Sequence, residues 1–226
     1  MVGKHSGVAR RLQSDDPHLV SNHCVAHRLA PASAQAVNDI RYLNEFKDVL
    51  RQLFRFYHNS GVRMSGLKAI QDVLGETDVS LKEGKDVRWL SHNPAVSALR
   101  RSYSSVIQIL NYEATEHNAA PAVGLLTFCL KFRFIASLLP FSDDLPPLAK
   151  LSKLFQKKGW PFTDVKVLVD GTKAAIEALK DSRGMHLSQL SATLEQFKEL
   201  GVHESSELDE VTFREQIELL LSSRVY

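Results

Sequence analysis

The hydrophobic positions of this chain recur every three or four residues over most of its length, the spacing of an amphipathic α-helix. The first long stripe begins at Ala32 and ends before Asn59-Ser60, where we expect Gly61 to form a left-handed cap. A second helix follows and is expected to stop near Gly75. The apolar positions of the two stripes are Val37, Ile40, Leu43, Phe46, Val49, Leu50, Leu53, Phe54 and Tyr57, then Met64, Leu67, Ile70, Val73 and Leu74.

Helical spacing resumes after a polar segment, Glu76 to Lys85, which we interpret as a loop. The next helix has Pro94 in its first turn and Ser91 or Asn93 as its cap. Its stripe is Val96, Leu99, Tyr103, Val106, Ile107, Leu110 and Ala114, with Arg100 and Arg101 on the outer side. Pro121 then opens a helix in which Val123 to Leu139 is apolar nearly all round. Because Lys131 and Arg133 fall inside it and it is short for a bilayer, we interpret it as a buried helix.

Prolines divide the second half of the chain. Pro140 is expected to break the chain, and Leu145-Pro146-Pro147 to start a new helix. Asp143 and Asp144 would then lie near the positive end of that helix dipole. Thr163 is expected to cap another helix, and two further helices follow Gly184. The last of them has a capping box made by Thr212 and Glu215.

The first thirty residues have a different pattern. Residues 4–13 predict a short helix whose basic face carries Lys4, Arg10 and Arg11. This face can contact phosphate groups or can simply face solvent. His18 to Val25 suits a short buried strand, and helix-favouring residues return from Ala26. The pattern therefore predicts a mainly α protein with a boundary near residue 30, dividing residues 1–30 from residues 31–226.

Composition narrows the class of protein only slightly. The 226 residues are 44% hydrophobic, as in a globular protein, and the formal net charge is +2. That charge is too small to indicate nucleic-acid binding by bulk attraction, so any such contact needs a local patch. The two cysteines lie far apart, which indicates no disulfide framework and suits a reducing compartment.

Cys24 and His27 have the spacing to share one face of a helical turn, as a pair of metal ligands would. Zinc takes four protein ligands, or three and a water, so His5, His18 or His23 would have to complete the site. A buried Cys near a hydrogen-bonded His is the interpretation that we favour. A nucleophilic Cys–His pair would need a third, orienting group. We therefore predict no metal and no cofactor.

Three stretches taken together resemble the hAT superfamily of transposases and its domesticated vertebrate relatives, which are similar to zinc-finger proteins. The stretches are Val2 to Leu12, His23 to Leu29, and Asp86 to Ser91, which matches the Arg-Trp motif of that family. The segment from Leu145 to Gln156 is similar to a later helical signature. The resemblance covers most of residues 1–160 in order, which is more specific than any one of the motifs.

The resemblance implies an RNase H-like core interrupted by a large helical insertion. Residues 1–30 would be a remnant edge of that core with one short strand, and residues 31–226 would be the helical insertion domain. Members of the family cut DNA with an Asp, Asp, Glu triad that binds two metal ions. None of the three acids has a match here, since Asp15 and Asp16 precede Pro17 in a predicted loop. The resemblance thus implies a catalytically incomplete protein of the nucleus rather than an enzyme.

The same resemblance assigns nucleic-acid contacts to Cys24, His27, Arg88 and Trp89. In the family, the matching Trp is thought to stack at the hairpin-forming DNA end, with the Arg on phosphate. A Trp just before a helix can also fill the core, and this alternative stays open. If the resemblance carries function, the four residues should lie on one continuous surface.

Three functions remain open at this point. The leading one is a transposase-derived protein that binds nucleic acid, protein partners or both, including a second copy of itself. The second is a purely helical interaction scaffold without DNA binding, and the third is a fragment of an active transposase. No feature of the sequence indicates a membrane partner or a small-molecule substrate.

Overall fold

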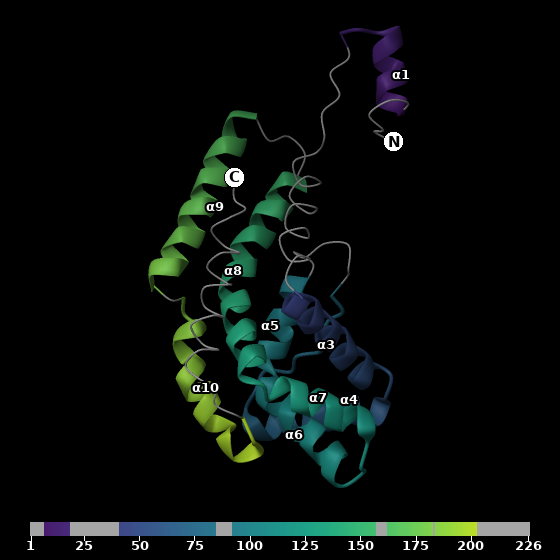
Figure 1. Cartoon of the computed structure of the whole chain (residues 1–226), viewed down its shortest axis with the longest axis vertical. Helices are drawn as coiled ribbons and strands as arrows, with labels where there is room; N and C mark the ends of the chain where they lie inside the picture. The colour runs from purple at the N-terminus through teal and green to yellow at the C-terminus, as the bar shows by residue number, and fades with distance from the viewer. Residues whose placement is uncertain (1–6, 19–40, 85–91, 157–161, 183, 203–226) are drawn as a thin grey trace.

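The computed structural model describes residues 7–18, 41–84, 92–156, 162–182 and 184–202, and these residues form helices without a sheet (Figure 1). The long helix α8 (Phe132–Gln156) runs through the middle, and α9 (Phe162–Ser182) packs beside its C-terminal part. Five helices form the part of the molecule beyond the N-terminal half of α8: α3 (Arg41–His58), α4 (Gly61–Leu74), α5 (Asn93–Arg101), α6 (Tyr103–Thr115) and α7 (Ala120–Cys129). Of these, α5 and α7 contact α8, and α4 packs on α3 and α6. The shorter elements are α1 (Val8–Asp15), α10 (Leu190–Gln196) and the 3₁₀ turns η2 (Leu187–Gln189) and η3 (Lys198–Leu200).

The hydrophobic core lies where α3, α6 and α7 meet the N-terminal half of α8. Phe46 of α3 is fully buried, and its ring centroid lies 5.0 Å from that of Phe134 and 5.5 Å from that of Phe141. Two tyrosines satisfy their buried hydroxyl groups on main-chain carbonyls: Tyr57 donates to Val106 and Tyr103 donates to Cys129. The helical stripes of the sequence therefore converge on one shared core.

The C-terminal elements are attached to this core by fewer buried residues. The ring of Phe197, which follows α10, packs edge-on against Tyr103 of α6 at 5.2 Å. Val202 at the end of the described chain is also buried. Among the described side chains of α9, by contrast, Ile176 alone is buried.

The structure confirms the prediction of a mainly helical protein and several helix ends. Gly75 adopts a left-handed conformation at the end of α4, as its position predicts. Pro94 and Pro121 each lie in the first turn of a helix. The predicted strand from His18 to Val25 and the boundary near residue 30 fall almost entirely within residues 19–40, which lie outside the described residues.

The prediction that Pro140 breaks the chain is wrong. Helix α8 continues through Pro140, Pro146 and Pro147, so Asp143 and Asp144 lie in mid-helix and not at a helix start. A proline inside a helix costs about 3 kcal/mol, because its ring clashes with the preceding turn and a hydrogen bond is lost. Burial of most of this helix offsets that cost, which local propensity does not include.

Other predicted helix boundaries also differ. Gly61 begins α4 and does not cap the helix before it; the Ser60 hydroxyl caps α4 by accepting from the Arg63 amide. His92 is the residue before α5, without a side-chain cap, and α9 begins at Phe162, so Thr163 is already helical.

Two helices predicted as continuous are each divided. The stripe from Val96 to Ala114 is interrupted at Ser102, whose hydroxyl donates to the carbonyl of Ala98. The apolar run from Val123 to Leu139 is interrupted between Cys129 and Phe132. Both interruptions preserve the apolar spacing, so periodicity alone does not reveal them.

Candidate nucleic-acid interface

Most of the residues predicted to contact nucleic acid, from the resemblance or from the basic face of residues 4–13, lie outside the described residues. These are Lys4, Cys24, His27, Arg88 and Trp89. Whether Cys24 and His27 share a surface with Arg88 and Trp89 therefore stays a prediction. What the structure does place is the chain on each side of residues 85–91, which carry the Arg-Trp motif.

Arg10 and Arg11 are described, on the short helix α1. Both side chains are exposed, and α1 contains no buried residue. Val8 and Leu12 of the same helix are also exposed, by 56% and 50%. The two arginines are thus accessible to a phosphate group, which is the condition that the predicted contact requires.

The chain leading to the Arg-Trp motif is held against α4 by a buried glutamine. The Gln71 side chain is fully buried and donates to the Val79 carbonyl at 3.1 Å, while its oxygen accepts from the Val79 amide at 3.4 Å. An amide side chain that bonds both the N–H and the C=O of one residue acts like a neighbouring β-strand. Gln71 therefore fixes the course of a segment that the sequence predicts only as a polar loop.

Further contacts hold this segment, residues 76–84, to the helices. The Ser105 hydroxyl of α6 donates to Glu76 at 2.5 Å, and Lys68 of α4 pairs with Asp78 at 3.2 Å. Leu81 is buried in the core cluster. The approach to the motif is therefore part of the packed structure, since three separate side-chain attachments and one apolar residue secure it.

Gly84 and His92, the described residues on either side of residues 85–91, lie against each other. Both residues are buried, and His92 is only 1% exposed. A Cβ atom built on Gly84 would lie 2.7 Å from Nε2 and 3.1 Å from Cγ of the His92 ring, and closer still to Cδ2. The imidazole therefore lies directly on the glycine backbone. We call this the loop-base contact.

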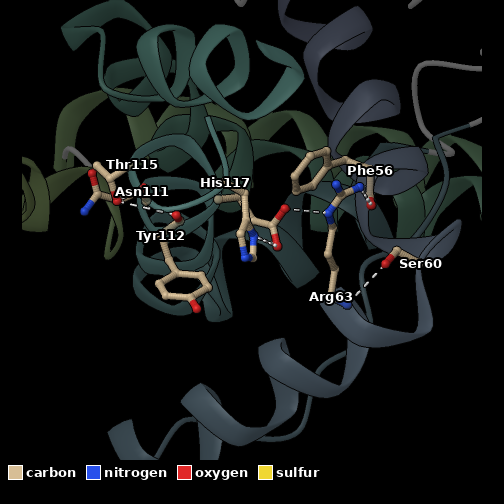
Figure 2. Close-up of polar contacts among 8 residues, drawn as sticks. Phe56, Ser60, Arg63, Asn111, Tyr112, Thr115 and His117 are labelled. Carbon is tan, nitrogen blue, oxygen red and sulfur yellow. Dashed lines mark hydrogen bonds and ion pairs between the residues drawn. The ribbon is translucent and has the colours of Figure 1, made fainter. Parts of the chain in front are cut away.

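A second polar group joins α4 to α6 around the buried carboxylate of Glu113 (Figure 2). Arg63 Nε contacts one Glu113 oxygen at 3.1 Å, and His117 Nδ1 contacts the other at 3.4 Å. The Arg63 guanidinium also lies 4.0 Å above the Phe56 ring, as Figure 2 shows from the side. The His117 ring packs edge-on against Tyr112 at 5.3 Å. These contacts join α4 to α6 and give each oxygen of the Glu113 carboxylate a basic partner.

A third polar group lies where α8 meets the turn before α10. The Asp143 carboxylate accepts from the main-chain amides of His186, at 3.0 and 3.2 Å, and Leu187, at 3.1 Å. Gly184 fits closely here, because a Cβ atom on it would lie 2.8 Å from Asp143 Cγ, and its φ of +59° suits glycine. Asp143 thus anchors η2 to α8, a role that the predicted helix start does not include.

Burial, together with nearby charges, shifts the pKa values of two residues close to Asp143. Burial, followed by the adjacent charge of Asp143, raises the pKa of Asp144 to about 7. Burial also lowers the pKa of His186, and Arg100 lowers it further, while Asp143 opposes the shift. The His186 Nδ1 atom is buried without a hydrogen-bond partner among the residues that the structure describes. Burial therefore favours the uncharged form of both His186 and Asp144.

The described residues contain no group of three or more His, Cys, Asp or Glu side chains that could hold a metal ion. Cys129 is completely buried, and burial raises the pKa of its thiol far above the usual range. A thiol that stays protonated is a poor nucleophile and a poor metal ligand. None of the helices in the described ranges is long and apolar enough to cross a bilayer.

Four residues with structural roles carry no signal in the sequence: Gln71, Gly84, His92 and Glu113. A single polar residue within a helical stripe does not change the apolar spacing, and a glycine in a polar loop predicts only a turn. A Gln on the apolar face of α4, beside Leu67, is the one signal that could have indicated a buried anchor.

Comparison with known proteins adds no assignment. No protein-family model matches this chain, and no solved structure matches it.

Proposed function

We propose that this chain is a catalytically inactive, transposase-derived nuclear protein that binds nucleic acid through residues 85–91, with protein partners as a second class of ligand. The observation that carries the proposal is the anchoring of both flanks of this segment. Gln71 holds the chain before it, and the loop-base contact joins Gly84 to His92, the described residues on either side of it. A recognition loop is effective when a packed scaffold fixes where it begins and ends.

The residue types of the segment suit an unpaired nucleic-acid strand. An Arg guanidinium contacts phosphate through several N–H groups, and a Trp ring stacks on any base. Stacking of this kind contributes roughly 1–3 kcal/mol per base. Arg88 and Trp89 are adjacent, so one nucleotide can meet both kinds of contact. The exposed Arg10 and Arg11 of α1 supply further phosphate contacts in this proposal.

The experiment is fluorescence anisotropy of a labelled single-stranded DNA over a range of salt concentrations. The logarithm of the binding constant should fall linearly with the logarithm of salt, with a slope of about −0.7 for each phosphate contacted. Arg88→Ala should reduce that slope by about 0.7. Arg55→Ala is the matched control, since Arg55 is an exposed arginine of α3 and its loss changes the net charge equally.

A helical interaction scaffold is the second candidate, and one observation favours it. Val62 and Val73 of α4 are 82% and 84% exposed and lie eleven residues apart, about three helical turns on one side of α4. Binding of DNA that does not weaken with salt, or no binding at all, would favour this scaffold over the nucleic-acid proposal.

Catalytic inactivity has its own test. A two-metal centre needs carboxylates that bridge the ions, and none of the three acids of the family has a match in this sequence. The purified chain should leave DNA intact with magnesium or manganese. Metal-dependent cleavage that is lost in Asp15→Asn or Asp16→Asn would contradict the proposal.

A further inference from the structure

Helix α8 is weakened at one point near its middle. Pro146 and Pro147 follow each other inside the helix, and a proline has no N–H group. The carbonyls of Ser142 and Asp143, four residues earlier, therefore receive no main-chain hydrogen bond of the α-helical pattern. The Ser142 hydroxyl also donates to the carbonyl of Leu138 at 2.7 Å, a kind of contact that tends to bend helices. Prolines are the commonest cause of bending within a long helix.

The packing of α8 changes at the same point. Before the two prolines, every residue from Phe134 to Leu145 except Asp143 is buried. After them, Ala149 and Leu151 are the buried residues of α8, and α9 packs on this part of the helix. Figure 1 shows α9 and the end of α8 extending away from α4, α6 and α7. We call α9, together with α8 after Pro147, the outer lobe.

The second connection of the outer lobe lies beside the first. Helix α9 ends at Ser182, and Gly184 follows two residues later with a φ of +59°. A Cβ atom on Gly184 would lie 2.8 Å from Cγ of Asp143, so the two chain segments are in contact. Asp143 also accepts from the amides of His186 and Leu187. Since both connections lie together, the outer lobe can turn about one point, as domains do about a hinge.

We propose that Ser142 to Pro147 form a hinge, about which the outer lobe turns relative to the core helices, and that the charge of Asp144 sets its position. Asp144 lies within the hinge and is 5% exposed. A neutral carboxyl can keep this buried place, whereas a carboxylate needs water or an opposite charge. Opening of the hinge supplies water and leaves the core packed. The hinge goes beyond the proposed function and does not depend on it.

The charges around Asp144 favour its neutral form. Burial, followed by the charge of Asp143, raises its pKa to about 7. Arg100 of α5 and His186 of the turn before η2 interact with Asp143 and with each other. Among the described residues, α9 and α10, which also pack on α8, add no charge that shifts the pKa of Asp144.

The direction of the pH effect follows from the two protonation states. The closed hinge holds the proton up to about pH 7, whereas an open, hydrated carboxyl has the ordinary value of 3.8. The equilibrium constant for opening should therefore rise about tenfold for each pH unit between these values, and about a thousandfold in all. Below this range the hinge is closed, and above it the constant no longer changes.

Pulsed electron spin resonance tests the motion by measuring the distance between two nitroxide labels. Gln52→Cys of α3 and Val167→Cys of α9 place them on exposed positions of the core and of the outer lobe. Cys24→Ser removes one native thiol, and the other, on Cys129, is completely buried and stays unlabelled. We expect one distance at about pH 5 and a second population at about pH 8. A single, unchanged distance at both pH values would overturn the proposal.

Two further measurements separate the hinge from other effects of pH. In Asp144→Asn the distance should not depend on pH, whereas Asp72→Asn, which alters an exposed acid of α4, should behave like the unaltered chain. A pH-dependent distance that persists in Asp144→Asn would overturn the role of this residue. Labels on Gln52→Cys and Gln108→Cys, both on core helices, should keep one distance at both pH values. If this second distance also changes, the core unfolds and the hinge is contradicted.

The prolines locate the hinge. Pro146→Ala with Pro147→Ala restores two main-chain donors, so the ratio of open to closed forms at about pH 8 should fall about tenfold. Pro121→Ala is the matched control, because Pro121 lies in the first turn of α7, where an N–H has no helical acceptor. An unchanged ratio in the double variant would overturn the proposal. If that variant does not fold, Pro146→Ala alone replaces it, with the same expected and contrary results.

Discussion

Glu113 and Asp144 are both buried carboxylic acids, but their surroundings are opposite. Glu113 of α6 is 8% exposed and lies between Arg63 and His117, each within 3.4 Å of one of its oxygens. Asp144 of α8 is 5% exposed and stands beside another acid, Asp143. The surroundings of Glu113 stabilise its ionised form, whereas those of Asp144 destabilise its ionised form.

The difference shows how one helical fold uses burial in two ways. A buried charge is costly unless an opposite charge and hydrogen bonds replace its water, as they do for Glu113. Without them, burial favours the protonated acid and raises its pKa, as it does for Asp144. Removing a partner of Glu113 should therefore lower the free energy of unfolding. Removing the charge of Asp144 should raise it.

The largest effect is expected from pH acting on Asp144. Burial raises its pKa to about 7 in the folded protein, against an ordinary value of 3.8, so folding takes up a proton between these two pH values. The contribution of Asp144 is greatest below pH 3.8 and is lost as pH rises to about 7, with a span of roughly 4 kcal/mol. Asp144→Asn carries no charge and should remove this loss. Its free energy of unfolding should therefore rise relative to the unaltered chain as pH increases from 4 to 8.

Urea denaturation at several pH values measures this span. Asp170→Asn is the control, because Asp170 is an exposed residue of α9 and its amide should leave the pH dependence unchanged. If the free energy of unfolding of Asp144→Asn has the same pH dependence as that of the unaltered chain, Asp144 is ionised in the folded protein. The contrast with Glu113 would then disappear.

The next largest effect is expected from Arg63→Met. The substitution keeps an unbranched side chain above Phe56 but leaves the Glu113 carboxylate buried with one exposed partner. The loss should be about 2–3 kcal/mol, below the 3–5 of a fully buried pair, because the Arg63 side chain is 29% exposed. Replacing both residues, Arg63→Met with Glu113→Leu, should recover most of this loss. Equal losses in the single and double variants would show that the charge of Glu113 is not what makes the junction sensitive.

The smallest effect of the series is expected from His117→Ala. The His117 side chain is 56% exposed and contacts Glu113 at 3.4 Å. Exposed ion pairs contribute about 0.2–1 kcal/mol, so the loss should lie in that range. Chemical denaturation at low and high salt measures it, and salt should reduce it further. A loss as large as that of Arg63→Met would mean that the two partners share the carboxylate equally.

Much of the fold follows from the sequence, because apolar spacing reflects which helix face is buried. The stripes of α3 and α6 contain the residues that are fully buried in the structure, including Phe46, Leu53 and Leu110. The course of α8 through Pro140 does not follow, since the burial that offsets the prolines comes from elements such as α5, which lie far away in the sequence. Local rules place a break wherever they meet proline and cannot weigh it against tertiary burial.

The candidate site shows the same limit more sharply. The sequence identifies Arg88 and Trp89 through a motif, but it does not identify what fixes their flanks. Gly84 and His92 are significant only because they are in contact. Gln71 is significant only because its side chain hydrogen-bonds to the main chain of Val79. Contacts of this kind are set by the path of the chain between helices, which no short sequence window contains.

The central claim is that Trp89 binds nucleic acid rather than filling the core, and Trp89→Ala tests it directly. Single-stranded DNA affinity and the free energy of unfolding are measured on this one variant, with Trp160→Ala as the control for loss of an indole. We expect binding to weaken by roughly 1–3 kcal/mol, the contribution of one stacked base, with stability nearly unchanged. A loss of about 3–5 kcal/mol in folding free energy without a specific defect in binding would place Trp89 in the core and contradict the account.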